Sequence, residues 1–257
     1  MKKIKRNFRF ISRLDIKDQY LIKSINFEGL RKVGFVKDFA IKYYKENIDE
    51  IFYIDAVSSL FSKKFIRDFL KMACEEIRVP VTVGGGIKNV EQAKKILRSG
   101  ADKIAINTAA VKRPNLLKEL SDLIGSQSVV SYIEAKKNKV NSTWEICINN
   151  GRENTGIDIM KWIEIVQKKG IGELLITSVD REGTEKGFAD DLYQKLSKNV
   201  DVPMIANGGC GKIEDIVKVY NNFSVDGVAI SSALHFDKVK INEIKKCFKR
   251  KNFNIRF

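Results

Sequence analysis

Eight short apolar runs alternate with amphipathic stretches along the 257 residues of this chain. The runs are almost continuously apolar, which is typical of parallel strands buried on both faces, and the stretches between them have the spacing of surface helices. The runs read FRFISRLDI, EIFYIDA, VPVTVGG, KIAIN, SVVSYIEA, ELLITSVD, VPMIANGG and GVAISSA. Eight strand–helix units in a chain of this length predict a single α/β domain over residues 1–257, a (β/α)8 TIM barrel. A doubly wound open sheet is the alternative, but no G-x-G-x-x-G motif follows the first run.

Segments of the first half of the chain recur in the second half at offsets of 119 to 125 residues. The matched pairs are 14–18 (LDIKD) with 133–137 (IEAKK), 79–86 with 202–209, 101–107 with 225–231, and Asp55 with Asp180. Repetition in one order and at nearly one offset predicts two half-barrels, about 1–125 and 126–257, that are related by a pseudo-twofold axis. The first and fifth strands then face each other across the barrel.

Asp15 and Glu134 occupy the same place in this repeat, each near the end of an apolar run. In a barrel both side chains would lie at the carboxyl ends of the strands, where barrel active sites are found. Two carboxylates on opposite sides of one cavity suit a general acid and a general base. The alternative is that each acid caps the following helix or pairs with a neighbouring lysine, Lys17 or Lys136.

Two glycine-rich turns lie at matching places in the repeat, and hydroxyl or amide residues follow the next strand in each half. Glycine lets the backbone approach an anion closely, and a following helix N-terminus presents free N–H groups to it. Two such cradles predict a substrate with a phosphate at each end; turn geometry alone is the alternative. The predicted ligands are Gly85, Gly86, Asn107 and Thr108 in the first cradle, and Asn207, Gly208, Gly209, Ser231 and Ser232 in the second.

Residues 18–35 and 137–154 exceed what a minimal barrel needs, and both follow a strand on the active-site face. We expect 18–35 to be a long loop that acts as a mobile lid and brings Lys23 to the substrate. An ordinary solvent-facing lysine is the alternative. We expect 137–154 to form a short β excursion.

Charged residues stand at or near the starts of four predicted strands, at the opposite end of the barrel. They are Arg9, Glu50, Lys103 and Glu173. Alternating charges at this place can form a salt-bridged ring that closes the barrel bottom. Such a ring either serves stability alone or acts as a gate into a tunnel.

Composition narrows the classes of function. The chain has 47 lysine and arginine residues against 32 acidic ones, a net charge of +15. These basic residues lie beside acidic ones on nearly every predicted helix, which predicts a solvated surface that attracts anionic substrates rather than a nucleic-acid site. No apolar run could span a membrane and no signal peptide is evident, so we expect a cytoplasmic protein. One histidine and four scattered cysteines predict reduced thiols, no metal site and no cofactor.

Over almost its whole length the chain resembles the cyclase subunit of imidazole glycerol phosphate synthase. The stretches that carry the resemblance are LDIKD, NFEGLRKVG, VTVGGGI, GADKIAINTAA, GSQSVV, GELLITSVDREGT and GGCGK. That family is a (β/α)8 barrel of histidine biosynthesis that forms a heterodimer with a glutaminase. The resemblance implies a lyase in which ammonia crosses the barrel from bottom to top. There the ammonia reacts with a bis-phosphorylated ribulosyl-formimino-carboxamide ribonucleotide.

The resemblance also implies roles for single residues. It assigns acid and base roles to the two facing acids and ammonia gating to the four charged residues at the bottom. It places Lys23 in the substrate loop and Asp102 near the interface with the glutaminase. Asp180 and Gly183 fall in the substrate pocket.

Three positions depart from the family pattern. Glu134 stands where an aspartate is usual, Arg13 where a small or thiol side chain is usual, and Asn207 where a serine is usual. A catalytic group that is misplaced by about 1 Å can lower the reaction rate on the order of 100-fold. These departures resemble a paralogous branch found in surface-polysaccharide clusters, which implies ammonia supply to a sugar amidotransferase. Three hypotheses follow: a cyclase/lyase, an ammonia-conducting module, and, on charge alone, a nucleic-acid-binding protein.

Overall fold

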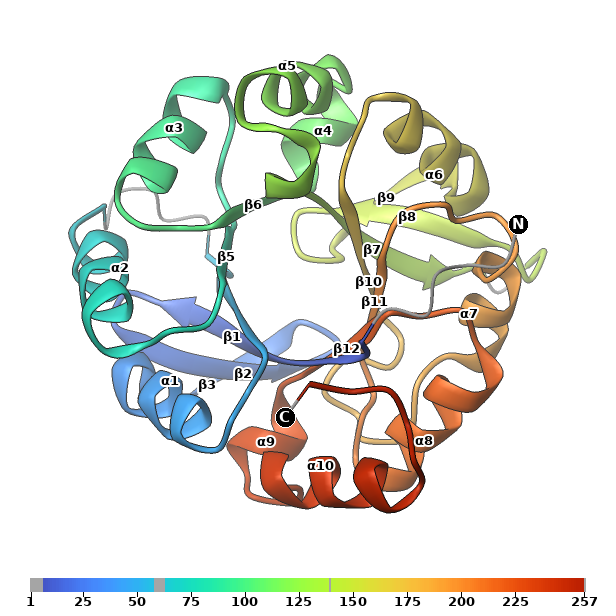
Figure 1. Ribbon diagram of the computed structural model, residues 1–257. Coiled ribbons are helices and arrows are strands. Elements are labelled where there is room, and N and C mark those ends of the chain that lie inside the picture. Colours follow the sequence, from blue (N-terminus) through green and yellow to red (C-terminus); the bar gives the residue numbers. More distant parts are fainter. Residues whose placement is uncertain (1–6, 58–62, 139, 257) are drawn as a thin grey trace.

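Eight parallel strands close into a barrel surrounded by helices, which confirms the predicted (β/α)8 architecture (Figure 1). The structure is a computed structural model that describes residues 7–57, 63–138 and 140–256. The strands follow the order β10-β11-β12-β1-β4-β5-β6-β7, and β7 pairs with β10 to close the ring. β1 and β7 therefore lie on opposite sides of the barrel. The barrel strands are β1 (Arg9–Lys17), β4 (Glu50–Asp55), β5 (Val81–Gly84), β6 (Lys103–Ile106), β7 (Val129–Lys137), β10 (Glu173–Ser178), β11 (Met204–Asn207) and β12 (Gly227–Ile230).

Helices follow the strands and form the outer layer of the barrel (Figure 1). Local signals in the sequence define several of their ends. Asn89 accepts a hydrogen bond from Gln92 N at 3.0 Å and so caps the start of α3, and Asp158 caps α6 through Met160 N at 2.8 Å. The helices are α1 (Val36–Lys45), α2 (Lys63–Glu76), α3 (Val90–Arg98), α4 (Thr108–Lys112), α5 (Asn115–Ile124), α6 (Ile159–Lys168), α7 (Asp190–Leu196), α8 (Ile213–Asn222), α9 (Ser232–His235) and α10 (Ile241–Arg250), with a 3-10 turn η2 at Ser126–Ser128.

Side chains alternate along the barrel strands between the layer under the helices and the inside of the barrel. On β1, Phe10, Leu14 and Ile16 pack under the helices, whereas Ile11 packs inside. The core therefore has two parts, a large one between barrel and helices and a small one within the barrel. The inner apolar cluster consists of Ile11, Phe52, Ile54, Ala105, Val130, Tyr132, Leu175, Ile205 and Ala229.

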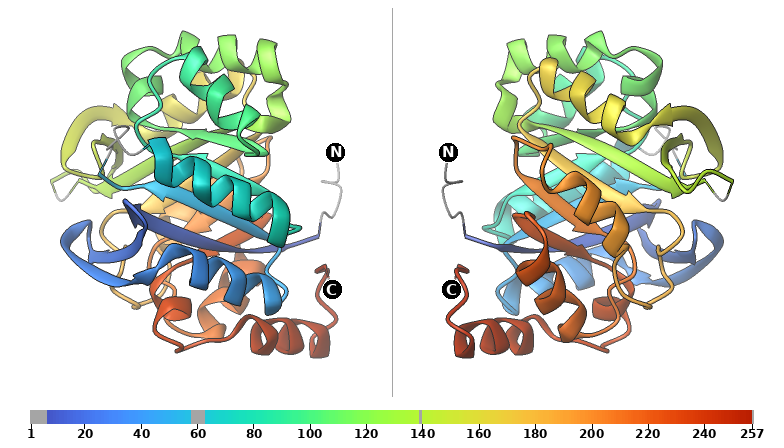
Figure 2. Two further views of the ribbon diagram at one scale, coloured as in Figure 1. Left: turned by 90° about the vertical axis from the view of Figure 1, so that its left-hand side faces the viewer. Right: turned by 90° about the vertical axis from the view of Figure 1, so that its right-hand side faces the viewer.

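Two β-hairpins extend from one end of the barrel, away from the C-terminal segment (Figure 2). β2 (Tyr20–Ile25) and β3 (Glu28–Phe35) form the first hairpin beside β1, so the prediction of a long loop over 18–35 was wrong. β8 (Trp144–Ile148) and β9 (Glu153–Asp158) form the second beside β7, which confirms a β excursion within 137–154. Each hairpin continues the strand that carries one of the two facing acids.

Corresponding turns in the two halves have the same backbone geometry. Asn107 precedes α4 with φ −120° and ψ −94°, and Ser231 precedes α9 with φ −122° and ψ −92°. Gly85 and Gly208 have φ values of 95° and 93°. The first and second cradles are thus built on one backbone plan.

One proposed match between the halves was wrong. β4 and β10 both begin with a glutamate, Glu50 and Glu173, so their residues correspond at an offset of 123. At that offset Asp55 corresponds to Ser178 at the end of β10, whereas Asp180 lies two residues beyond the strand. The two aspartates are the same residue type but do not occupy the same position relative to their strands.

Candidate active site

Charged side chains gather inside the carboxyl end of the barrel. The alternation on β1 that places Ile11 inside also places Arg13 and Asp15 inside, and Lys23 reaches the same place from β2. Glu182, in the segment after β10, completes a group of four alternating charges. This top cluster consists of Arg13, Asp15, Lys23 and Glu182, and all four residues are buried.

Asp15 is bonded from two sides within the top cluster. Arg13 donates from Nε and Nη2, which lie 2.9 and 2.8 Å from Oδ1, and Lys23 Nζ lies 3.2 Å from Oδ2. Lys23 also pairs with Glu182, whose second oxygen lies 4.0 Å from Arg13 Nη1. Lys23 is therefore an interior residue, which excludes the solvent-facing alternative.

The pKa of Asp15 is set by two opposing effects. Burial alone would raise the pKa of Asp15, but the charges of Arg13 and Lys23 outweigh burial and hold it below its usual range. Burial would likewise lower the pKa of Lys23, yet Glu182 and Asp15 raise it. Asp15 and Lys23 both stay ionised at neutral pH.

Glu134, at the end of β7, has the opposite character. It is only 1% exposed, and its Oε2 accepts a hydrogen bond from Gly151 N at 2.8 Å. Burial raises the pKa of Glu134 to about 7, against the lowering effect of the Gly151 N–H group. Near neutral pH one facing acid is therefore ionised and the other is partly protonated, which is the arrangement that a base and an acid in one site require.

The turn of the second hairpin lies over the first cradle. Asn149 N donates a hydrogen bond to Thr108 Oγ1 at 3.1 Å. Two residues later, Gly151 N donates the hydrogen bond to Glu134. A Cβ on Gly151 would lie 3.1 Å from the ring of Phe27 at the tip of the first hairpin. The two hairpins therefore meet above the barrel, and the Thr108 hydroxyl accepts a bond from the second hairpin while its own O–H group can still donate to a phosphate.

Glycine is required in the first cradle for reasons of backbone shape. A Cβ on Gly85 would lie 2.2 Å from the carbonyl oxygen of Asp55, and both Gly85 and Gly86 have positive φ, 95° and 62°. Asn107 makes no side-chain hydrogen bond that caps α4. Turn geometry by itself thus accounts for the glycines on this side.

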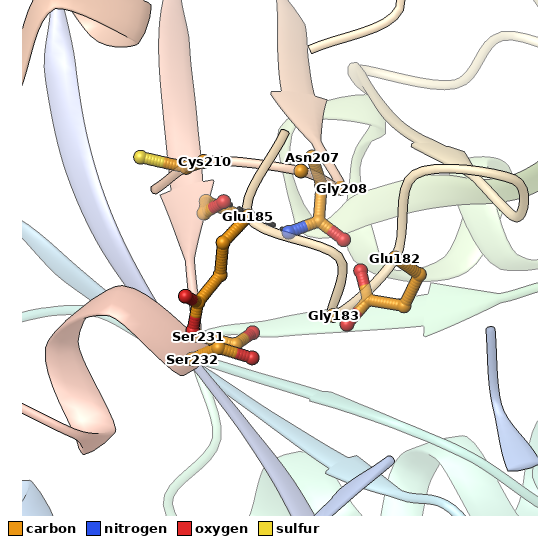
Figure 3. Close-up of a pocket in the computed structure, with 10 residues that line it drawn as sticks. Glu182, Gly183, Glu185, Asn207, Gly208, Cys210, Ser231 and Ser232 are labelled. Carbon is orange, nitrogen blue, oxygen red and sulfur yellow. Dashed lines mark hydrogen bonds between the residues drawn. The ribbon is translucent and has the colours of Figure 1, made fainter. Parts of the chain in front are cut away.

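The second cradle contains a small pocket of about 10 Å³ (Figure 3). A Cβ on Gly209 would lie 2.2 Å from the carbonyl oxygen of Gly187, so this turn also requires glycine. The buried Ser231 Oγ has no hydrogen-bond partner among the described residues, which leaves it available to an anion. The pocket is lined by Glu182, Gly183, Glu185, Asn207, Gly208, Gly209, Cys210, Ala229, Ser231 and Ser232.

Asn207 lines this pocket, but its amide serves the barrel interior. Oδ1 accepts hydrogen bonds from Arg13 Nη1 at 2.6 Å and from Thr177 Oγ1 at 2.8 Å, and Nδ2 donates to Ala229 O at 2.8 Å. The close-up shows the bond from the amide nitrogen as a dashed line (Figure 3). These contacts do not support the Asn207 amide as a phosphate ligand.

The predicted pocket residue Asp180 and its proposed repeat partner Asp55 both hold the backbone in place. Asp180 accepts a hydrogen bond from Lys137 N at 2.8 Å and so ties the segment after β10 to the end of β7. Asp55 accepts a hydrogen bond from Val57 N at 3.1 Å. Gly183 packs closely on the first hairpin, because a Cβ there would lie 2.3 Å from Ser24 O.

The four charged residues at the other end form the expected ring. Arg9 bonds Glu50 at 2.9 Å and also pairs with Glu173, while Lys103 Nζ lies 2.9 Å from an oxygen of each glutamate. Burial raises the pKa of Glu50, and the nearby Glu173 adds to this effect. Three members of this bottom ring, Arg9, Lys103 and Glu173, line a pocket of about 270 Å³.

Asp102 lies exposed at the same end as the bottom ring. Its Oδ2 accepts a hydrogen bond from Val81 N at 2.8 Å, so it fixes the start of β5. Asp226 does the same for Met204 N at 3.0 Å in the second half. This bond gives each acid a structural role at the start of a strand.

Neither a membrane span nor a metal cluster is found in the part of the chain that the structure describes. No helix there is long and apolar enough to cross a membrane. No group of three or more histidine, cysteine, aspartate or glutamate side chains there has a geometry that could hold a metal ion. The single histidine, His235, is buried between Tyr43 and the backbone of Arg13 and plays a structural part.

Comparisons with known proteins agree with this geometry. A family model described as "Histidine biosynthesis protein" matches residues 9–240. The imidazole glycerol phosphate synthase subunit HisF of Legionella pneumophila is 47% identical over 81% of this chain and 98% of its own length. The same subunit is 39% identical in Clostridium botulinum strain Okra and 38% identical in Methanococcus vannielii, each over 96% of this chain and 98% of the relative. The chain belongs to the HisF family.

Two residues of this HisF-family site were not among the predicted site residues. Arg13 had a usable signal, because Arg9, Ile11, Arg13 and Asp15 alternate on β1 and so share the inside of the barrel. Glu182 had none, since it lies in an irregular segment that only the closed barrel brings to Lys23. Both residues belong to the top cluster.

Proposed function

We propose that this chain is the cyclase/lyase barrel subunit of an imidazole glycerol phosphate synthase-type enzyme. It uses ammonia released by a glutaminase partner and acts on a bis-phosphorylated ribulosyl-formimino-carboxamide ribonucleotide. One observation carries the proposal. Asp15 and Glu134 end opposite strands of one barrel, and their environments favour opposite protonation states at neutral pH. An acid and a base held apart in this way suit a ring closure that needs both to give and to remove protons.

The remaining site residues support this function. Glu134 supplies a proton near neutral pH, and Asp15 remains an anion that stabilises positive charge on the reacting nitrogen. The second cradle, with the free Ser231 hydroxyl, binds one phosphate. The bottom ring is the gate through which ammonia enters the barrel, and Asp102 lies on the face that binds the glutaminase.

The test is turnover of the ribonucleotide by the purified chain with ammonium chloride as nitrogen source. We expect Asp15→Asn to abolish turnover and Glu134→Gln to reduce it on the order of 100-fold, because general acid–base groups contribute that much. Glu134→Asp keeps a carboxylate and retains activity. Glu214→Gln, at an exposed position of α8, is the matched control and leaves turnover unchanged. No turnover by the unmodified chain would refute the proposal.

A second candidate function is an ammonia-conducting module for a sugar amidotransferase. One observation favours it: Asp15 is already bonded by Arg13 and Lys23. Under this hypothesis the chain binds a glutaminase stably but does not turn over the ribonucleotide. Amidination of the sugar then continues when Asp15→Asn and Glu134→Gln are combined, whereas it stops if the acids perform chemistry.

A further inference from the structure

The guanidinium group of Arg13 lies in the middle of the barrel, where a passage along the axis would run. Arg13 is 1% exposed and is the largest of the fully buried side chains among the described residues. From β1 it reaches Thr177 on β10 at 3.2 Å and Asn207 on β11 at 2.6 Å. It also lies 5.3 Å from the ring centre of Tyr132 on β7, the strand opposite β1. A side chain that starts on one wall and contacts the opposite wall crosses the interior.

Arg13 separates two chemically different levels of the barrel. Ile11, two residues earlier on β1, belongs to the inner apolar cluster, and Asp15, two residues later, belongs to the top cluster. The bottom ring closes the opposite end. Between the two charged layers the interior is therefore filled by apolar side chains, among which a small neutral molecule passes far more easily than an ion.

We propose that Arg13 is a second, inner closure of the barrel, which separates the inner apolar cluster from the two facing acids. Ammonia that enters through the bottom ring reaches the acids only when this guanidinium moves aside. The identity of the molecule that passes rests on the proposed function, but the closure itself rests on geometry alone. A fixed cation at this level also disfavours passage of ammonium, because like charges repel strongly in a low dielectric.

A second carboxylate lies within reach of the guanidinium. Its Nη1 lies 4.0 Å from Glu182, a looser contact than its bonds to Asp15. Movement toward Glu182 would exchange the neutral partners Thr177 and Asn207 for a carboxylate, so the guanidinium would keep a charged partner as it moves. Glu182 also lines the second cradle, so an anion bound there acts on the carboxylate that receives Arg13.

The test places a thiol below the closure, by Ile11→Cys in the full chain. Labelling of this thiol by methyl methanethiosulfonate, which is small and neutral, is followed by the mass of the peptide that contains position 11. We expect the labelling rate to rise about tenfold when Arg13→Ala is added, because the inner apolar cluster then becomes accessible from the top face. Arg13→Met keeps most of the volume but loses every polar bond, and we expect an intermediate rise.

Two controls make the result specific. Thr177→Val removes one bond to Arg13 but leaves the guanidinium in place, so the labelling rate stays within about twofold of the parent. Amide hydrogen exchange of the β7 peptides shows whether a variant has loosened the barrel as a whole. Equal labelling with and without Arg13 overturns the proposal. Labelling needs neither glutaminase nor ribonucleotide, so its outcome is independent of the turnover experiment.

Discussion

Replacing Glu134 by glutamine should stabilise the protein above neutral pH. Glu134 is buried, and burial raises its pKa from the ordinary value of 4.5 to about 7. Between these values the folded chain holds a proton that the unfolded chain has lost, so the stability of the wild type falls as the pH rises through this range. Glutamine carries no charge and can still accept the hydrogen bond from Gly151, so the variant escapes this loss.

The size of the effect follows from the pKa difference. A pKa raised from 4.5 to about 7 means that folding favours the protonated over the ionised carboxyl group by about 3 kcal/mol. The stability difference between Glu134→Gln and the wild type should therefore move by about 3 kcal/mol in favour of the variant from pH 4.5 to pH 8.5. Most of the change should fall between pH 4.5 and pH 7.

Urea unfolding followed by circular dichroism at half-unit pH steps measures this difference. The exposed Glu214→Gln is the control and should give a curve parallel to that of the wild type. A constant difference between Glu134→Gln and the wild type across the pH range would refute the reasoning. It would mean that Glu134 titrates like an exposed glutamate and cannot act as a proton donor near neutral pH.

Three further predictions concern stability. Asp15→Asn removes the anion that two buried cations share and should cost about 3–5 kcal/mol at pH 7 in urea unfolding; a loss below about 1 kcal/mol would contradict the buried pairing. Lys103→Met leaves the two glutamates of the bottom ring to one arginine, and because burial already raises the pKa of Glu50, the melting temperature of this variant should fall increasingly with pH. Gly85→Ala should destabilise by at least about 2 kcal/mol more than Gly29→Ala, since both have positive φ but only Gly85 has a carbonyl oxygen 2.2 Å from the new Cβ; equal losses would show that the clash relaxes.

The sequence predicted the barrel because its signals are periodic and local. Near-continuous apolar runs at regular spacing specify parallel strands buried on both faces, and the repeat placed strands 1 and 5 opposite each other. Each of the eight predicted runs overlaps a barrel strand. The charged ring at the bottom was predictable for the same reason, since its members stand at or near strand starts.

The first hairpin escaped prediction because its turn lacks the usual residues. A two-residue turn with positive φ at both positions normally carries Asn-Gly, whose glycine tolerates that conformation. Here the turn is Asn26-Phe27, with φ values of 50° and 64°. The bulky Phe27 hides the turn signal but lies over the Arg13 guanidinium at 5.5 Å, which supplies a reason for its presence.

The top cluster could be predicted only in part because charge pairing between distant segments has no local signature. The alternation on β1 indicates that Arg13 points inward, but not that Lys23 and Glu182, 159 residues apart, bind each other. The hydrogen bond that the Thr108 hydroxyl oxygen accepts comes from a hairpin turn 41 residues away. Sequence patterns located the strand ends, whereas the closed barrel determined the partners.

The two charged layers divide unevenly between the halves of the chain. Residues 1–125 contribute the bottom-ring members Arg9, Glu50 and Lys103 and the top-cluster members Arg13, Asp15 and Lys23, whereas residues 126–257 contribute Glu173 and Glu182. In each layer the first half thus brings one surplus positive charge and the second half one negative charge. If the halves were expressed as separate fragments, each would carry one unpaired charge in each layer. A first half and a second half would then neutralise each other's charges, whereas two copies of the same half would not. Although the chain is built by internal repetition, the charges of its two layers therefore favour the pairing of two different halves over the pairing of two identical ones.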